Sequence, residues 1–227
     1  MSSTLKLIKA FDDVKNKLRK MPLEEMKLYI LQDALNDFWL QAPWRWTVGQ
    51  VTCAVTAANT DQTIVDPGNI LYLLDAIFTD GQTAYGLHPE SFLSSGTQLK
   101  GIPNKIAYVP SGPSFRLNPI PQNVPNANSW TIYARYKIKV PVLTPQNIIT
   151  AGTQLFDDEY FTVYKQAVLY YAYLWGDDQR AGSLQFAEGK STASGQLGVY
   201  LASVEKMKMS EPLITDYSQQ PGEERNT

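Results

Sequence analysis

Apolar residues recur every three or four positions between Leu5 and Phe38. They are Leu5, Ile8, Phe11, Val14 and Leu18 in a first stretch and Leu28, Leu31, Leu35 and Phe38 in a second. This spacing places the members of each set on one face of a helix. Pro22 suits the start of the second helix, where its missing N–H costs nothing, and Pro43 ends that helix. The pattern predicts a helical hairpin over residues 1–43.

Residues 44–152 have a different texture, rich in β-branched residues and interrupted by turn-forming residues. The clearest stretch is Trp130–Val140, where apolar residues alternate with Tyr133, Arg135, Lys137 and Lys139. This alternation predicts a strand whose apolar face is buried and whose charged face is exposed. Further strands are predicted at Arg45–Ala58, Ile70–Thr79, Lys105–Val109 and Phe115–Leu117.

Helical periodicity returns after Thr153. The members of the next apolar stripe are Tyr160, Tyr164, Val168, Tyr171 and Trp175. Acidic residues at 157–159 favour a helix start here, because the helix dipole stabilises negative charge in the first turn. A second helix is predicted through Asp178–Met207, with small residues along one side. The C-terminal segment, residues 210–227, shows no periodicity of its own.

This order of elements predicts an α+β fold. Residues 1–43 and 153–209 would share a helical bundle core, because neither helical segment can bury its apolar stripe alone. Residues 44–152 would form an inserted antiparallel β domain. Residues 210–227 would form an extended C-terminal arm.

Composition narrows the classes of function. Charged residues make up 19% of the chain, below the roughly 25% that is usual for soluble domains. The low charge suggests that another protein covers part of the surface. A formal net charge of −2 excludes a generally basic nucleic-acid binder. Apolar runs are much shorter than the roughly 20 residues that a membrane helix needs, so no membrane span is predicted.

The chain offers little catalytic or metal-binding chemistry. It has one cysteine, Cys53, and one histidine, His88, which removes most histidine-based catalysis and most metal sites. The cysteine is interpreted as a buried, inert thiol. A hydrolase that uses Asp66 and Asp75 stays an alternative, but its two carboxyl groups would have to lie within about 5–10 Å of each other. We therefore predict a protein that is not an enzyme, with no catalytic residue, metal or cofactor.

Aromatic and small residues are the candidates for contacts between subunits. Two tryptophans stand where the second helix passes into the first strand, and either core packing or subunit contact would explain them. Several tyrosines cover more than one face of the predicted helix after Thr153. Glycines on the last predicted helix would let a neighbouring backbone come close. The predicted interface residues are Trp44, Trp46, Tyr170, Tyr173, Ser191, Gly195 and Gly198.

Five segments carry a resemblance to a known family. They are Asn36–Asp37–Phe38–Trp39 with Pro43–Trp44–Arg45–Trp46–Thr47, Lys105–Ile106–Ala107–Tyr108, Trp130–Thr131–Ile132–Tyr133–Ala134–Arg135–Tyr136, Lys139–Val140–Pro141–Val142–Leu143–Thr144–Pro145, and Trp175–Gly176–Asp177–Asp178–Gln179–Arg180–Ala181. In this order and spacing, residues 20–210 resemble the head–tail connector, or adaptor, proteins of tailed bacteriophages, especially the short-tailed type.

The resemblance implies a structural virion protein at the head–tail junction, made in the host cytoplasm. Such a protein would form a twelve-subunit ring under the portal, join the capsid to the tail and line the DNA ejection channel. Its partners would be the portal protein, a tail tube or nozzle protein and further copies of itself. DNA would pass without sequence-specific binding, and no membrane would be involved.

The resemblance also assigns residues 210–227 as a portal-binding arm. Its apolar anchors would be Pro212, Leu213, Ile214 and Tyr217. The alternative function is another interaction protein of the virion, such as a tail-completion or baseplate component.

Overall fold

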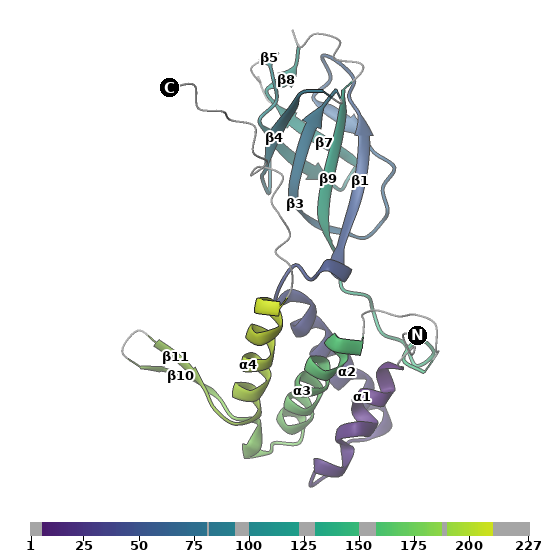
Figure 1. Ribbon diagram of the computed structural model, residues 1–227. Coiled ribbons are helices and arrows are strands. Elements are labelled where there is room, and N and C mark those ends of the chain that lie inside the picture. The colour runs from purple at the N-terminus through teal and green to yellow at the C-terminus, as the bar shows by residue number, and fades with distance from the viewer. Residues whose placement is uncertain are drawn as a thin grey trace. The chain divides into compact units, whose positions relative to one another are not determined.

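The chain divides into two compact units in the computed structural model. The structure describes residues 6–80, 82–93, 100–122, 130–149, 158–187 and 190–210. Within these ranges, the helical unit comprises residues 6–46 and 140–210, and the β unit comprises residues 47–139 (Figure 1). Within the described residues, the chain crosses from one unit to the other after Trp46 and after Lys139.

Four α-helices are found in the described part of the helical unit. They are α1 (Leu7–Val14), α2 (Glu24–Leu40), α3 (Asp158–Trp175) and α4 (Gly195–Ser210), with 3-10 turns η1 (Lys15–Lys17) and η4 (Gln179–Ala181). Helices α2 and α3 pack together, and the Tyr164 hydroxyl donates a hydrogen bond of 2.9 Å to the Leu31 carbonyl. The short α1 buries Phe11 and Val14 of the predicted stripe. It also buries Leu7, whereas Ile8 of the predicted stripe is only half-buried.

The predicted helices around α1, α2 and α3 are confirmed, but the last predicted helix is wrong over its first half. In place of a helix from Asp178, the chain forms η4 and then a hairpin of β10 (Leu184–Ala187) and β11 (Lys190–Ala193). Gly182 and Gly195 adopt φ values of +80° and +58°, which no right-handed helix contains. Between them, the Ser194 amide donates to the Ser183 carbonyl at 3.0 Å and closes the base of the hairpin.

The β unit contains a curled seven-stranded sheet (Figure 1). Its strands are β1 (Val48–Ala54), β2 (Asp61–Thr63), β3 (Ile70–Thr79), β4 (Ala84–Pro89), β6 (Lys105–Val109), β7 (Ser114–Asn118) and β9 (Thr131–Ile138). The order is β1-β9-β3-β4-β6-β7-β2, and every pairing is antiparallel except that of β4 with β6. A separate parallel pair joins β5 (Lys100–Gly101) to β8 (Ile120–Pro121).

Strand β9 lies between β1 and β3, so one register positions three strands. Ala134 is paired with Val51 on one side and with Ala76 on the other. The predicted apolar face of β9 is confirmed, since Ile132 and Ala134 are fully buried. Lys137 is also fully buried, although the alternation predicts an exposed side chain at that position.

The sheet encloses a hydrophobic core of its own. Phe78 stacks on Trp130 with ring centroids 4.4 Å apart. The core also includes Ile106, Phe115, Leu117, Ile132 and Ala134, all nearly inaccessible to solvent.

These observations correct the fold class. An α+β fold built on a helical bundle core from the N- and C-terminal helices was predicted, and this prediction is wrong. The fold is mixed α and β, with a large curled sheet and four described helices. The physical reason is that the strands bury their apolar residues among themselves, so the β segment is no appendage of a helical core. No described helix is long and apolar enough to cross a membrane.

Candidate functional site

The two predicted interface tryptophans lie in an aromatic cluster of the helical unit. Trp44 is fully buried, and its indole Nε1 donates to the Phe38 carbonyl at 2.7 Å. Its ring lies 5.3 Å from the Phe38 ring and 5.9 Å from the Tyr160 ring. Trp46 is half-buried and meets Trp39 edge-on at 4.9 Å. These placements support core packing, the first of the two explanations that the sequence left open.

The predicted tyrosines occupy different environments on α3. Tyr173 is buried, and the Arg180 guanidinium lies over its ring at 4.4 Å. Tyr170 is half-buried and meets Tyr171 edge-on at 4.9 Å. Burial, with a smaller contribution from the Asp37 carboxylate, raises the pKa of Tyr170. Neither tyrosine side chain is therefore fully exposed for contact with another subunit.

The predicted stripe of small residues is not one helix face. Ser191 is exposed in β11, whereas Gly195 begins α4 and Gly198 lies one turn into it. A Cβ on Gly195 would lie 2.8 Å from the Arg180 carbonyl oxygen, and one on Gly198 would lie 2.7 Å from the Ala193 carbonyl oxygen. Both glycines therefore permit close backbone approach within one subunit. Their contact with a second subunit stays a prediction.

The hairpin of β10 and β11 exposes two large apolar side chains of the helical unit. It forms a two-stranded sheet by itself and extends away from α4 (Figure 1). Leu184 and Phe186 are 45% and 77% exposed, and they are two residues apart on β10, so they share one face. Sequence reasoning missed this hairpin. The available signals were Gly182–Ser183 before the strand and Ser194–Gly195 after it, which are turn residues rather than helix formers.

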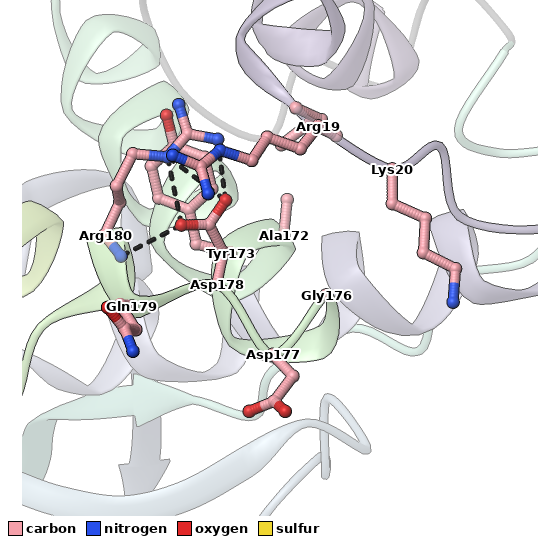
Figure 2. A pocket seen from close by; sticks show the side chains of 10 residues that line it. Arg19, Lys20, Ala172, Tyr173, Gly176, Asp177, Asp178, Gln179 and Arg180 are labelled. Carbon is pink, nitrogen blue, oxygen red and sulfur yellow. Dashed lines mark hydrogen bonds and ion pairs between the residues drawn. The ribbon is translucent and has the colours of Figure 1, made fainter.

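A hollow of about 510 Å³ lies at the end of α3 (Figure 2). Its walls come from the end of α3, from η4 and from the segment that follows η1. The polar and aromatic residues that line it are Arg19, Lys20, Tyr173, Asp177, Asp178, Gln179 and Arg180. Because Arg19 and Asp178 lie far apart in sequence, no local pattern predicts this hollow.

Two arginines act on one carboxylate in the hollow. Arg180 Nε donates to Asp178 Oδ1 at 3.0 Å, and Arg180 Nη2 donates to Asp178 Oδ2 at 2.6 Å. The Arg180 amide also donates to the Asp178 carboxylate, which caps η4. These hydrogen bonds, with a smaller effect of the Arg19 charge, lower the pKa of Asp178 to about 2. Asp178 is therefore ionised throughout the physiological range.

A second hollow, of about 380 Å³, belongs to the β unit. Leu71, Tyr72, Tyr108 and Pro110 contribute to its wall, with Lys139 among the charged residues at its edge. Leu71 and Tyr72 are 41% and 47% exposed. This hollow offers mainly apolar and aromatic contact, in contrast to the charged hollow beside α3.

The residues that the sequence offers for catalysis lie in environments that are typical of structural residues. His88 is exposed on β4, and Cys53 is buried on β1, where burial raises the pKa of its thiol to about 11. Asp75 accepts a hydrogen bond from Arg135 Nε at 2.8 Å, and Asp66 accepts one from the Tyr108 hydroxyl at 3.3 Å. Among the described residues, no group of three or more histidine, cysteine, aspartate or glutamate side chains could hold a metal ion.

The predicted portal-binding residues lie outside the described residues. They are Pro212, Leu213, Ile214 and Tyr217.

Residues 10–210 match the family model of the SU10 adaptor protein. The match covers far more than half of the chain and includes both units. The chain belongs to the SU10 adaptor protein family. This membership confirms the resemblance to phage head–tail adaptors. A comparison with curated proteins found no match.

Family membership determines the general role of this adaptor. It is a structural component of a bacteriophage virion, and a structural adaptor family implies that it is not an enzyme. The family also indicates portal and tail proteins as the class of partner. The hairpin, with its exposed apolar side chains, and the charged hollow are the described surfaces that we consider as contacts for another protein.

Proposed function

We propose that this adaptor assembles into a twelve-subunit ring under the portal. The ring joins the capsid to the tail, binds a tail tube or nozzle protein below, and lines the channel through which DNA is ejected. DNA passes through without sequence-specific binding. Family membership supports the adaptor role, and the exposed hairpin is the observation that supports self-assembly.

The hairpin supports assembly because it is expected to be only marginally stable without a partner. A two-stranded sheet is only marginally stable in water, and both edges of this one lack a neighbouring strand among the described residues. Covering one large apolar side chain such as Phe186 stabilises an assembly by roughly 1.5–3 kcal/mol. In a ring, each subunit offers one such hairpin to the next, so a single heterologous contact repeats around the symmetry axis.

We further propose that the C-terminal residues 210–227 dock on the portal. Pro212, Leu213, Ile214 and Tyr217 are the apolar anchors of this arm. One arm binds weakly, but a ring that presents many arms gains affinity through multivalency. The predicted interface residues Trp46, Tyr170 and Ser191 retain exposed surface and stay candidates for subunit contact.

The substitution Phe186→Ser tests the hairpin contact. It removes the apolar ring from a side chain that is 77% exposed, so the subunit itself should keep its fold. We expect the variant to bind portal-containing heads that lack the adaptor much less completely than the unchanged protein. Co-sedimentation with these heads, followed by quantification of adaptor copies per head, measures the effect.

Phe92→Ser is the matched control, because Phe92 is 75% exposed and belongs to the β unit. The control should bind heads with normal stoichiometry, and circular dichroism should show both variants folded. Normal ring stoichiometry for Phe186→Ser would contradict the hairpin contact. Binding to isolated tails or baseplates but not to portal-containing heads would favour the alternative role as a tail-completion or baseplate protein.

A further inference from the structure

In the charged hollow beside α3, cationic side chains outnumber carboxylates. Asp178 is already occupied by the side chain and the amide of Arg180. Arg19 and Lys20 are exposed at the hollow and have no hydrogen bond or ion pair within the described chain. Figure 2 shows the Arg19 guanidinium beside the pair formed by Asp178 and Arg180. The Arg19 guanidinium is therefore available to bind an additional anion.

The geometry and the charge favour a carboxylate on a peptide. A guanidinium presents a planar fork of donors that matches a carboxylate with two parallel hydrogen bonds. A volume of about 510 Å³ lies within the range of sites that enclose small ligands or a few side chains. Three cationic side chains face two carboxylates, Asp177 and Asp178, so the surplus is a single positive charge. Nucleic acid instead requires a succession of cations along its phosphates.

The chain itself contains a segment with the complementary charge. The segment after Ser210 carries four acidic side chains and one basic side chain. Two of the acidic ones, Glu223 and Glu224, are adjacent and follow Pro221–Gly222. They are separate from the apolar anchors proposed for the portal, which end at Tyr217. A segment of this length spans up to about 60 Å when extended, so it can reach a neighbouring subunit.

We propose that the hollow binds the acidic C-terminal segment of a second copy of this chain, with Glu223 or Glu224 paired with Arg19. The apolar part of the arm then remains available for the portal, and its acidic end links adjacent subunits. The inference rests on the proposed ring only for the position of the second copy. The pairing itself is measurable without a ring.

A peptide-binding assay tests the pairing on the full-length chain. The probe is a fluorescent synthetic peptide of residues 218–227, and the readout is fluorescence anisotropy at two salt concentrations. We expect weak binding that decreases with salt, because partly exposed charge pairs are screened. Arg19→Glu should weaken binding on the order of tenfold, because it removes a charge-assisted pair and adds repulsion. The matched control is Lys17→Glu, which makes the same charge change on an exposed residue that does not line the hollow.

A charge exchange provides the sharper result. A peptide with Glu223→Lys and Glu224→Lys should bind the Arg19→Glu chain better than it binds the unchanged chain. Equal weakening by Lys17→Glu, or equal binding of a peptide with both glutamates changed to glutamine, would overturn the proposal. Displacement of the probe by duplex DNA at lower concentrations than by unlabelled peptide would also overturn it and indicate a phosphate site. The Phe186→Ser assay on heads reports on the ring separately.

Discussion

The helical unit and the β unit keep polar groups inside in different ways. Around α2 and α3, aromatic rings fill the core, and a single hydrogen bond to the Phe38 carbonyl satisfies the buried indole N–H of Trp44. In the β unit, charged groups lie between strands. Asp75 on β3 and Arg135 on β9 are direct cross-strand neighbours, and their side chains are 11% and 15% exposed.

The contrast extends to ion pairs on the surface. The helical unit keeps its intrahelical pairs in solvent, as in Lys9 with Asp13 and Lys208 with Glu205. Exposed pairs of this kind contribute about 0–1 kcal/mol each. The sheet fixes Asp75 and Arg135 on adjacent strands and removes them from most of the solvent. Breaking the pair of Asp75 and Arg135 should therefore lower stability far more than breaking an exposed intrahelical pair.

The largest effect is expected for Trp44→Ala in the helical unit. The substitution removes a fully buried indole and should lower the free energy of unfolding by about 3–5 kcal/mol. Urea denaturation followed by circular dichroism measures it. Trp175→Ala is the control, since Trp175 is 43% exposed and should cost much less. Similar losses for both tryptophans would contradict an aromatic core centred on Trp44.

A somewhat smaller effect is expected for Asp75→Leu in the β unit. It leaves Arg135 largely buried without its carboxylate, and breaking such a pair costs about 3 kcal/mol. The double variant Asp75→Leu with Arg135→Met should regain much of the lost stability, because no unpaired charge remains. Lys208→Ala in the helical unit should change stability by less than about 0.5 kcal/mol. If Lys208→Ala matched Asp75→Leu in urea denaturation, the contrast between the units would fail.

The smallest change in stability concerns Cys53, which tests how tightly the sheet excludes solvent. Burial raises the pKa of this thiol to about 11, above its ordinary value of 9.0. At pH 8 the thiolate fraction is then about a hundredfold lower than in the unfolded chain, so iodoacetamide should label the native protein very slowly. Because the unfolded thiol ionises first, stability should fall as pH rises from about 9 to 11. Rapid native labelling, followed by mass spectrometry, would show that β1 opens readily.

Local patterns predicted the elements whose residues repeat with a simple period. The stripe that begins at Tyr160 and the acidic residues before it located α3, and the alternation after Trp130 identified β9. The same alternation misjudged Lys137. That side chain is fully buried, where its ammonium donates to the Thr47 hydroxyl at 2.6 Å. Period alone cannot reveal such a partner, because Thr47 lies far earlier in the chain.

The candidate surfaces depended on tertiary structure to a greater degree. Gly195 and Gly198 stood out in the sequence as candidates for subunit contact. In the structure, the backbones of Arg180 and Ala193 in the same subunit lie so close to them that a Cβ would clash. The hairpin that exposes Phe186 replaced half of a predicted helix. The charged hollow escaped prediction altogether, because it requires the segment after η1 to meet the end of α3.

The sequence by itself determined where most helices and strands form and which family the chain resembles, since both depend on local spacing and short motifs. Tertiary structure decided the order of the strands, the independent core of the sheet and the meeting of Arg19 with Asp178. Backbone pairing and side-chain packing act between residues that are distant along the chain. Strand order and buried charge are therefore properties of the assembled fold, and no local period encodes them.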